Sequence, residues 1–183
     1  MALQRLTING YGQLELNQVA FRRDGRIEAQ CKLDETDFAE IPAENGMLLT
    51  VDNINRTVKL YTEENAELPI ALNYTTEKIY DERTPGLKNF ASTLKSFLPR
   101  LGYLSVGDKF TTNTVCYDNG DFADDDALME AVAGVAETKL YGQPCENGAI
   151  QITTEVPTTS VKLLVIKKTT MPDGQPAVKF QAV

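Results

Sequence analysis

The segment VKLLVIKKTTMPDGQPAVKFQAV (residues 161–183) predicts a β-hairpin and makes this chain a β-rich protein. Its two arms, 161–169 and 177–183, are rich in apolar and β-branched residues, which favour strands. Between them lies a Pro172-Asp173-Gly174 turn, in which proline fixes one φ angle and glycine accepts a positive one. We expect the second arm to be held in its own sheet; the alternative is that a neighbouring subunit covers it.

The rest of the chain is also rich in strand patterns. The alternation is clearest over 26–33, where Ile27, Ala29, Cys31 and Leu33 are predicted to be buried on one face of a single strand. A hairpin turn is expected before it, at 22–25. Further strands are predicted at 3–8, 13–21, 47–52, 57–62, 69–74, 101–106, 109–117 and 149–156.

Two segments have helical patterns instead. Over about 86–98, apolar residues recur at i, i+3, i+4 and i+7, and Thr84-Pro85 supplies an N-cap and a first helical residue. A second helix is predicted over about 124–138, where Gly134 is a weak point. The expected fold class is therefore mainly β (α+β), with antiparallel sheets forming a sandwich or barrel-like core and one or two short helices.

The change of pattern near the first helix suggests a domain organisation. We predict an N-terminal β-rich unit over 1–83, a helical connector over 84–99 and a C-terminal α+β unit over 100–183. One continuous domain is the alternative, because no Gly/Ser linker marks the boundary.

Composition excludes several classes of function. The chain has 183 residues, 26 acidic against 18 basic side chains and a net charge of −8. Direct binding to nucleic acid or to an anionic membrane is therefore not expected, since both need a basic face. No apolar run approaches the length of a bilayer span, and the first ten residues have no signal-like apolar core.

Site chemistry is sparse as well. The chain has no histidine, which removes His-dependent nucleophiles and His-ligated zinc. Cys31, Cys116 and Cys145 form no CxxC pair and are predicted to be reduced and buried, although one disulfide among them is possible. We expect no enzyme activity, no catalytic or metal site and no cofactor.

A cluster of six carboxylates lies between Asp118 and Glu130. Its spacing does not fit an EF-hand loop, and acidic residues often gather at a helix N-terminus, where they cap free N–H groups. Helix capping is the preferred interpretation, and a bound cation such as Ca²⁺ is the alternative.

Three runs of sequence carry a resemblance to a known class of protein: YTTEKIYDERTPGLKNF (74–90), LSVGDKFTTNTVCYD (104–118) and TTMPDGQPAVKFQAV (169–183). With its acidic, threonine-rich composition, the chain resembles virion structural proteins of tailed bacteriophages, above all head-decoration or capsid-cement proteins. The resemblance implies a role in the virion, contact with the major capsid protein of the same particle, and homo-oligomeric or lattice contacts. It identifies no site residue.

Two other functions remain open from the sequence. One is a tail or connector component of the same kind of virion. The other is a solitary β-sandwich module that binds a ligand, with or without Ca²⁺.

Overall fold

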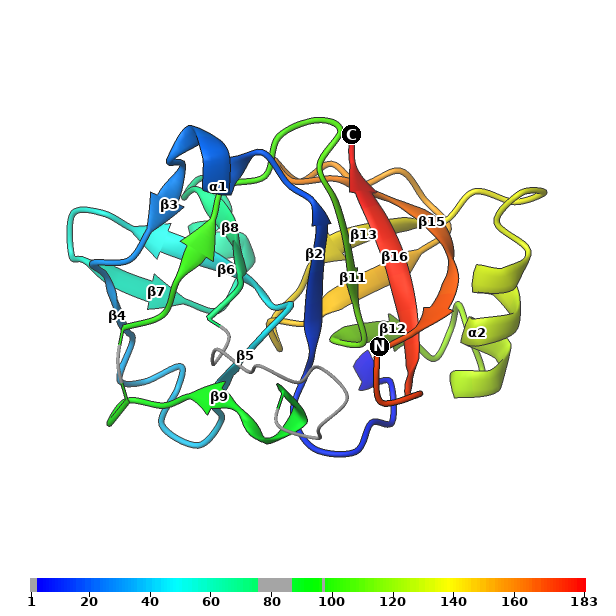
Figure 1. Cartoon of the computed structure of the whole chain (residues 1–183), viewed down its shortest axis with the longest axis horizontal. Coiled ribbons are helices and arrows are strands. Elements are labelled where there is room, and N and C mark those ends of the chain that lie inside the picture. The colour runs from blue at the N-terminus through cyan, green and yellow to red at the C-terminus, as the bar shows by residue number, and fades with distance from the viewer. Residues whose placement is uncertain (1–2, 76–86, 97) are drawn as a thin grey trace.

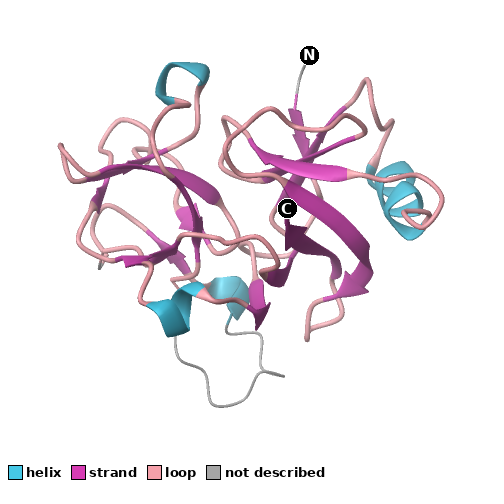
Figure 2. Ribbon diagram, turned by 90° about the horizontal axis from the view of Figure 1, so that it is seen from above, coloured by secondary structure: helices cyan, strands magenta, loops and turns pink. Residues whose placement is uncertain are grey.

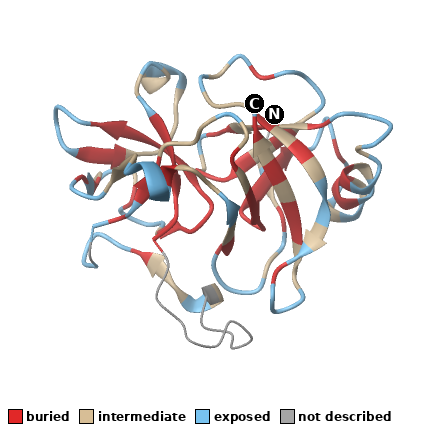
Figure 3. Cartoon of the chain, turned by 45° about the horizontal axis from the view of Figure 1, so that its top comes forward, coloured by how far each residue is buried: buried red, intermediate tan, exposed pale blue. Residues whose placement is uncertain are grey.

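The computed structural model describes residues 3–75, 87–96 and 98–183, and it contains two strongly curled β-sheets side by side (Figure 1). Viewed from above, the sheets form two lobes, and helix α2 (Asp125–Ala133) lies on the outer side of one of them (Figure 2). Buried residues concentrate on the strands, whereas the connecting loops are mostly exposed (Figure 3). The predicted fold class, mainly β with short helices, is confirmed.

The large sheet has eight strands in the order β1-β12-β14-β13-β15-β16-β11-β2. They are β1 (Leu3–Arg5), β2 (Leu14–Gln18), β11 (Lys109–Thr112), β12 (Val115–Asp118), β13 (Tyr141–Pro144), β14 (Ile150–Thr153), β15 (Leu163–Thr170) and β16 (Pro176–Ala182). The predicted C-terminal hairpin is β15–β16, with Val165 opposite Phe180. Because β16 also pairs with β11, the end of the chain is held inside its own sheet, as expected.

One bent segment of the chain supplies both β11 and β12, and this makes the large sheet curl. Only Asn113 and Thr114 separate these strands, yet β11 pairs with β16 whereas β12 pairs with β14. Strand β12 pairs with β14, and the pairings continue through β13, β15 and β16 to β11. The order of strands therefore leads back to the same bent segment. The N-terminal strands follow the same segment, with β1 along β12 and β2 along β11.

The small sheet has six strands in the order β3-β10-β8-β6-β7-β4. They are β3 (Ile27–Glu28), β4 (Lys32–Leu33), β6 (Leu48–Asp52), β7 (Thr57–Lys59), β8 (Ile70–Asn73) and β10 (Leu101–Gly102). Its two edges, β3 and β4, are consecutive in the chain. The short connection between them, Ala29–Cys31, spans at most about 14 Å, so this sheet also curls until its edges lie close together.

The single strand predicted over 26–33 is therefore wrong. The segment leaves an antiparallel pairing with β10 and enters a parallel pairing with β7, so it bends between the two. At the bend, the Glu28 carboxylate accepts a 3.1 Å hydrogen bond from the backbone N–H of Cys31. This N–H therefore has a partner without pairing to a neighbouring strand. Cys31 and Leu33 are buried as predicted, but Ile27 is half-buried and Ala29 is exposed.

The predicted helix over about 86–98 is also wrong in the part that the structure describes. Its first residues, 84–86, and Phe97 lie outside the described residues. Leu87–Asn89 form one 3-10 turn, and Ala91–Ser92 form strand β9, which pairs with β5 (Ala43–Glu44) as a separate two-stranded sheet. Pairing with a distant segment outweighs the local helical spacing of the apolar residues. Sequence periodicity contains no information about such a distant partner.

Helix α2 confirms the other helical prediction at its N-terminal end. The Asp124 carboxylate accepts the N–H of Ala127 at 2.8 Å and so caps the helix. The helix ends at Ala133, earlier than the predicted Thr138, because turns begin at Gly134. The turn expected at 22–25 is instead a short helix, α1 (Phe21–Asp24), ended by Gly25 at φ +70°.

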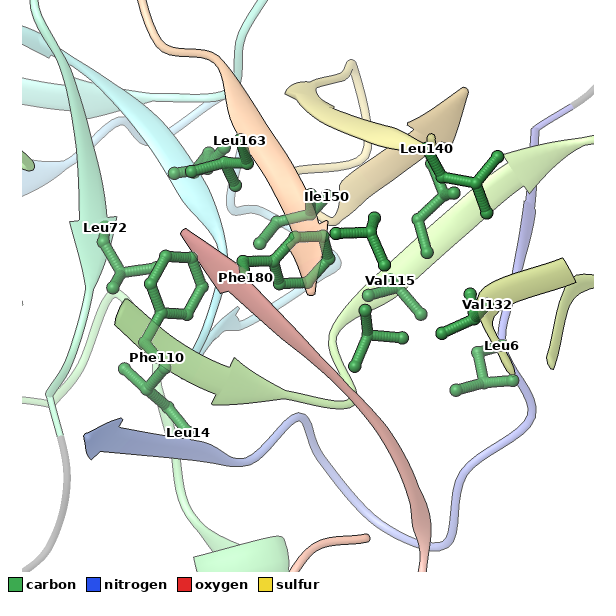
Figure 4. Packing of buried hydrophobic residues seen from close by; sticks show 14 of the residues in the cluster. Leu6, Leu14, Leu72, Phe110, Val115, Val132, Leu140, Ile150, Leu163 and Phe180 are labelled. Atoms are coloured by element: carbon green, nitrogen blue, oxygen red, sulfur yellow. The ribbon is translucent and has the colours of Figure 1, made fainter. Parts of the chain in front are cut away.

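One hydrophobic core extends across both sheets. Figure 4 shows Leu72 of the small sheet close to Phe110 of the large sheet, within a cluster that also contains Phe180. The rings of Phe110 and Phe180 lie 5.6 Å apart. Leu49 and Ala71 project from the opposite face of the small sheet into a second cluster. Strands β6 and β8 are therefore buried on both faces: one face of each strand points toward the large sheet, and the other points into the curl of the small sheet.

Strand pairings connect the ranges that were predicted as N-terminal and C-terminal units. Strands β1 and β2, from the first range, pair with β12 and β11. Strand β10, from the last range, pairs with β3 and β8 of the small sheet.

Candidate functional site

Exposed apolar side chains gather beside the two-stranded β5–β9 sheet. Ala43 lies opposite Ser92 in this antiparallel pair, and Ile41 and Leu94, two residues beyond them, line the same hollow. Tyr11 joins them, since its N–H donates to the carbonyl of Lys88 at 2.7 Å, just before β9. Together with Leu98, these residues are between 39% and 44% exposed. We call Tyr11, Ile41, Leu94 and Leu98 the β5–β9 face.

Two shallow hollows open on this face and share Leu94. One, of about 400 Å³, is lined by Tyr11, Phe38, Ala39, Glu40, Ile41, Pro42, Thr93, Leu94 and Lys95. The other, of about 380 Å³, is lined by Lys32, Leu33, Glu35, Thr93, Leu94, Ser96, Leu98 and Pro99. Charges stand at their rims, including an ion pair between Lys32 and Glu35 at 3.0 Å. The hollows thus combine apolar and charged side chains, a mixture that is also found at protein interfaces.

Other exposed apolar side chains among the described residues are scattered. Ile54 is 93% exposed in the turn between β6 and β7, and Val106 and Val156 lie in separate loops. Single exposed apolar residues are common on protein surfaces, whereas exposed apolar residues that lie together form a candidate interaction site. The β5–β9 face is such a group.

The acidic cluster over 118–130 is engaged in local structure. Asp118 accepts the N–H of Gly120 at 2.8 Å, and Asp124 caps α2. Asp125 accepts the Tyr117 hydroxyl at 2.8 Å and the Thr7 N–H at 2.9 Å. The capping interpretation is thus confirmed for Asp124. Within the described ranges, no three Asp, Glu or Cys side chains converge as metal ligands.

The contact between Tyr117 and Asp125 shifts the ionisation of both groups. Burial raises the pKa of Tyr117 to about 12, helped by the hydrogen bond that its hydroxyl donates to Asp125. Burial also acts to raise the pKa of Asp125, but the hydrogen bonds from Thr7 and Tyr117 outweigh it, and the pKa of this carboxyl is lowered. Asp125 therefore ties β12 and the N-terminal segment to α2.

A buried polar junction, which the sequence analysis missed, links the two sheets. The Arg5 guanidinium of β1 donates two hydrogen bonds to the Glu44 carboxylate of β5, at 2.7 and 2.9 Å. The same carboxylate accepts the N–H of Gly12 at 2.6 Å. A Cβ atom at position 12 would collide with the hydroxyl of Thr114, so glycine is required for this close approach.

The junction continues through backbone carbonyls of β5 and of the residue after it. The Thr114 hydroxyl donates to the carbonyl of Asn45, and the Asn73 side chain donates to the carbonyl of Glu44 at 2.9 Å. Because both side-chain oxygens of Glu44 accept hydrogen bonds, the carboxylate is held in place. The junction's role is structural. No local pattern signals it, because its members come from β1, β5, β8 and the β11–β12 bend.

The cysteines are buried and free, as predicted. Cys31 belongs to the core of the small sheet, where burial and the nearby Glu28 carboxylate raise its pKa to about 11. Cys116 and Cys145 come together on the large sheet, with their Sγ atoms 3.0 Å apart. Sequence spacing did not indicate this pairing.

The chain matches no family model, no curated protein and no solved structure. Among the described residues, no helix has the length and apolar character needed to cross a membrane.

Proposed function

We propose that this chain is a structural protein of a tailed-phage virion and that it binds the outer capsid lattice as a decoration or cement protein. The β5–β9 face carries this proposal: four apolar side chains from distant parts of the sequence are left exposed together. A protein that acts by docking needs such a surface and needs neither cofactor nor catalytic group.

Charge also supports this role. A net charge of −8 keeps closely spaced copies soluble through mutual repulsion, while the β5–β9 face contacts the shell. The partner is the major capsid protein of the same particle, with contacts between neighbouring copies on the lattice.

The test is co-sedimentation with particles of the phage that encodes the chain. Particles stripped of accessory proteins are mixed with the purified full chain, and bound protein is quantified by mass spectrometry. The native chain should bind at stoichiometric, saturable levels. Leu94→Asp, which places a charge at the shared edge of the two hollows, should weaken binding by at least about tenfold, equivalent to about 1.4 kcal/mol.

Ile54→Asp is the matched control, because Ile54 is equally apolar, is 93% exposed and lies on the β6–β7 turn. It should bind like the native chain, and both variants should melt like the native chain. Absence of the protein from capsids at any concentration refutes the decoration role. Association with isolated tails, or assembly of the pure protein into rings or tubes, favours a tail or connector component instead.

A further inference from the structure

Cys116 and Cys145 form a buried pair at one end of the large sheet. Cys116 lies on β12, and Cys145 directly follows β13, 29 positions further along the chain. Their side chains are 0% and 4% exposed and pack with Ala149 and Leu3 in a small cluster of their own. A tight turn after Cys145, closed by a 2.9 Å hydrogen bond from the Gly148 N–H to its carbonyl, holds the second sulfur against the first.

The two thiols of the pair differ in their surroundings. The contact between the two thiols lowers the pKa of Cys145 and raises that of Cys116. The Cys145 thiol also donates to the side-chain oxygen of Asn147 at 3.0 Å and to the Ala149 carbonyl at 3.1 Å. The positive charge of Arg5 acts to lower the pKa of both thiols and does not distinguish them. A thiolate is the form of cysteine that attacks disulfides, and we assign Cys145 as the nucleophile because it lines a hollow open to solvent, whereas Cys116 is fully buried.

Cys145 also borders a hollow that is open to solvent. It lines a hollow of about 750 Å³ together with Tyr61, Glu63, Gln143, Gln151 and Thr159, among other residues. The walls supply amide, hydroxyl and carboxylate groups, and the volume is typical of sites that accept small molecules. Cys31 has no place in this hollow, and burial together with Glu28 keeps its thiol protonated.

We propose that Cys116 and Cys145 are a redox-active dithiol, which a low-molecular-weight disulfide entering this hollow converts into an intramolecular disulfide. In the first step, the Cys145 thiolate attacks one sulfur of the small disulfide, forming a mixed disulfide and expelling one small thiolate. In the second, Cys116 gives up its proton to solvent and attacks Cys145 Sγ, which expels the second small thiolate. Two protein thiols are oxidised and one small disulfide is reduced to two thiols.

The bond requires a small local movement. The sulfur atoms must approach from 3.0 Å to about 2.05 Å, which side-chain rotation can supply. The cross-link fastens β12 to the β13–β14 turn, next to the parallel β12–β14 pairing. It closes a loop of about 30 residues in the unfolded chain, so the oxidised protein should melt roughly 5–15 °C higher.

The test uses the full chain and glutathione disulfide as the probe. Reduced protein is incubated with the probe, quenched in acid, unfolded and alkylated, and peptides are mapped by mass spectrometry. We expect Cys31 to be alkylated, Cys116 and Cys145 to be recovered as one cross-linked peptide pair, and the melting temperature to rise until dithiothreitol reverses it. Cys116→Ala should stop at the first step, with one glutathione bound to Cys145.

Cys31→Ser is the control, and it should form the cross-link at the native rate. The proposal is overturned if both thiols stay fully alkylatable after prolonged incubation, or if Cys31 enters the cross-link. A mixed disulfide on Cys145 of the native chain that never resolves would also overturn it, because Cys116 would then be unable to act. The test involves no phage particle, so its outcome is independent of the proposed virion role.

Discussion

Replacing Leu72 with alanine should destabilise both sheets together, because this side chain fills the core that they share. Leu72 is fully buried on β8 and belongs to the same cluster as Phe110 and Phe180 of the large sheet. Truncating a buried leucine costs about 2–5 kcal/mol, which includes the cavity left behind. In a chain of this size, 1 kcal/mol corresponds to a shift of about 2–4 °C in melting temperature, so we expect a fall of roughly 4–20 °C.

The informative comparison is Leu49→Ala, which deletes the same group from the second cluster, inside the curl of the small sheet. Unfolding is followed by tyrosine fluorescence and by far-ultraviolet circular dichroism, since the chain has seven tyrosines and no tryptophan. Both variants should shift one cooperative transition, identical by the two probes, and Leu94→Ala on the surface should shift it by less than about 1 kcal/mol. Two transitions, each moved by only one of the core variants, would refute the shared core.

Three further outcomes follow from single contacts. Asp124→Ala should lower the free energy of unfolding in urea by about 1 kcal/mol, because α2 loses its cap, whereas Asp124→Asn should be nearly neutral; equal losses would contradict the cap. Glu44→Ala should lower the free energy of unfolding by about 1–3 kcal/mol, because it leaves the Arg5 guanidinium and the Gly12 N–H without their partner. An unchanged urea midpoint would contradict the structural role of the junction. Because the pKa of Tyr117 is raised from 10.0 to about 12, its stabilising effect is complete below pH 10 and is lost as the pH rises towards 12. Tyr117→Phe should therefore show a shallower loss of stability over that range than the native chain or a Tyr11→Phe control, and parallel curves would argue against the shift.

Local sequence signals were reliable where structure depends on neighbouring residues. The C-terminal hairpin was predictable because Pro172-Asp173-Gly174 fixes its turn and the arms pair directly across it. The start of α2 was predictable for a similar reason, since the cap at Asp124 and the first buried positions lie within one turn of each other.

The same signals failed where a distant partner decides the conformation. Over 26–33, strict alternation predicted one strand, but the two halves of the segment pair with β10 and β7 at opposite edges of a curled sheet. Alternation specifies which residues share a face of a strand and contains no information about which strand is alongside. The bend, and with it the exposure of Ala29, follows from the curl of the whole sheet.

The β5–β9 face shows why the candidate site was harder to predict than the fold. Its members come from around positions 11, 41 and 94–98, and they meet only because β9 pairs with β5 and the Tyr11 backbone bonds to Lys88. In the sequence, Leu94 fits a helical stripe, which predicts burial in the core. In the structure, that stripe is broken, and Leu94 and Leu98 are 41% and 44% exposed. This joint partial exposure of apolar side chains is what the docking proposal rests on. Leu94 and Leu98 therefore belong both to the failed helix prediction and to the proposed docking face.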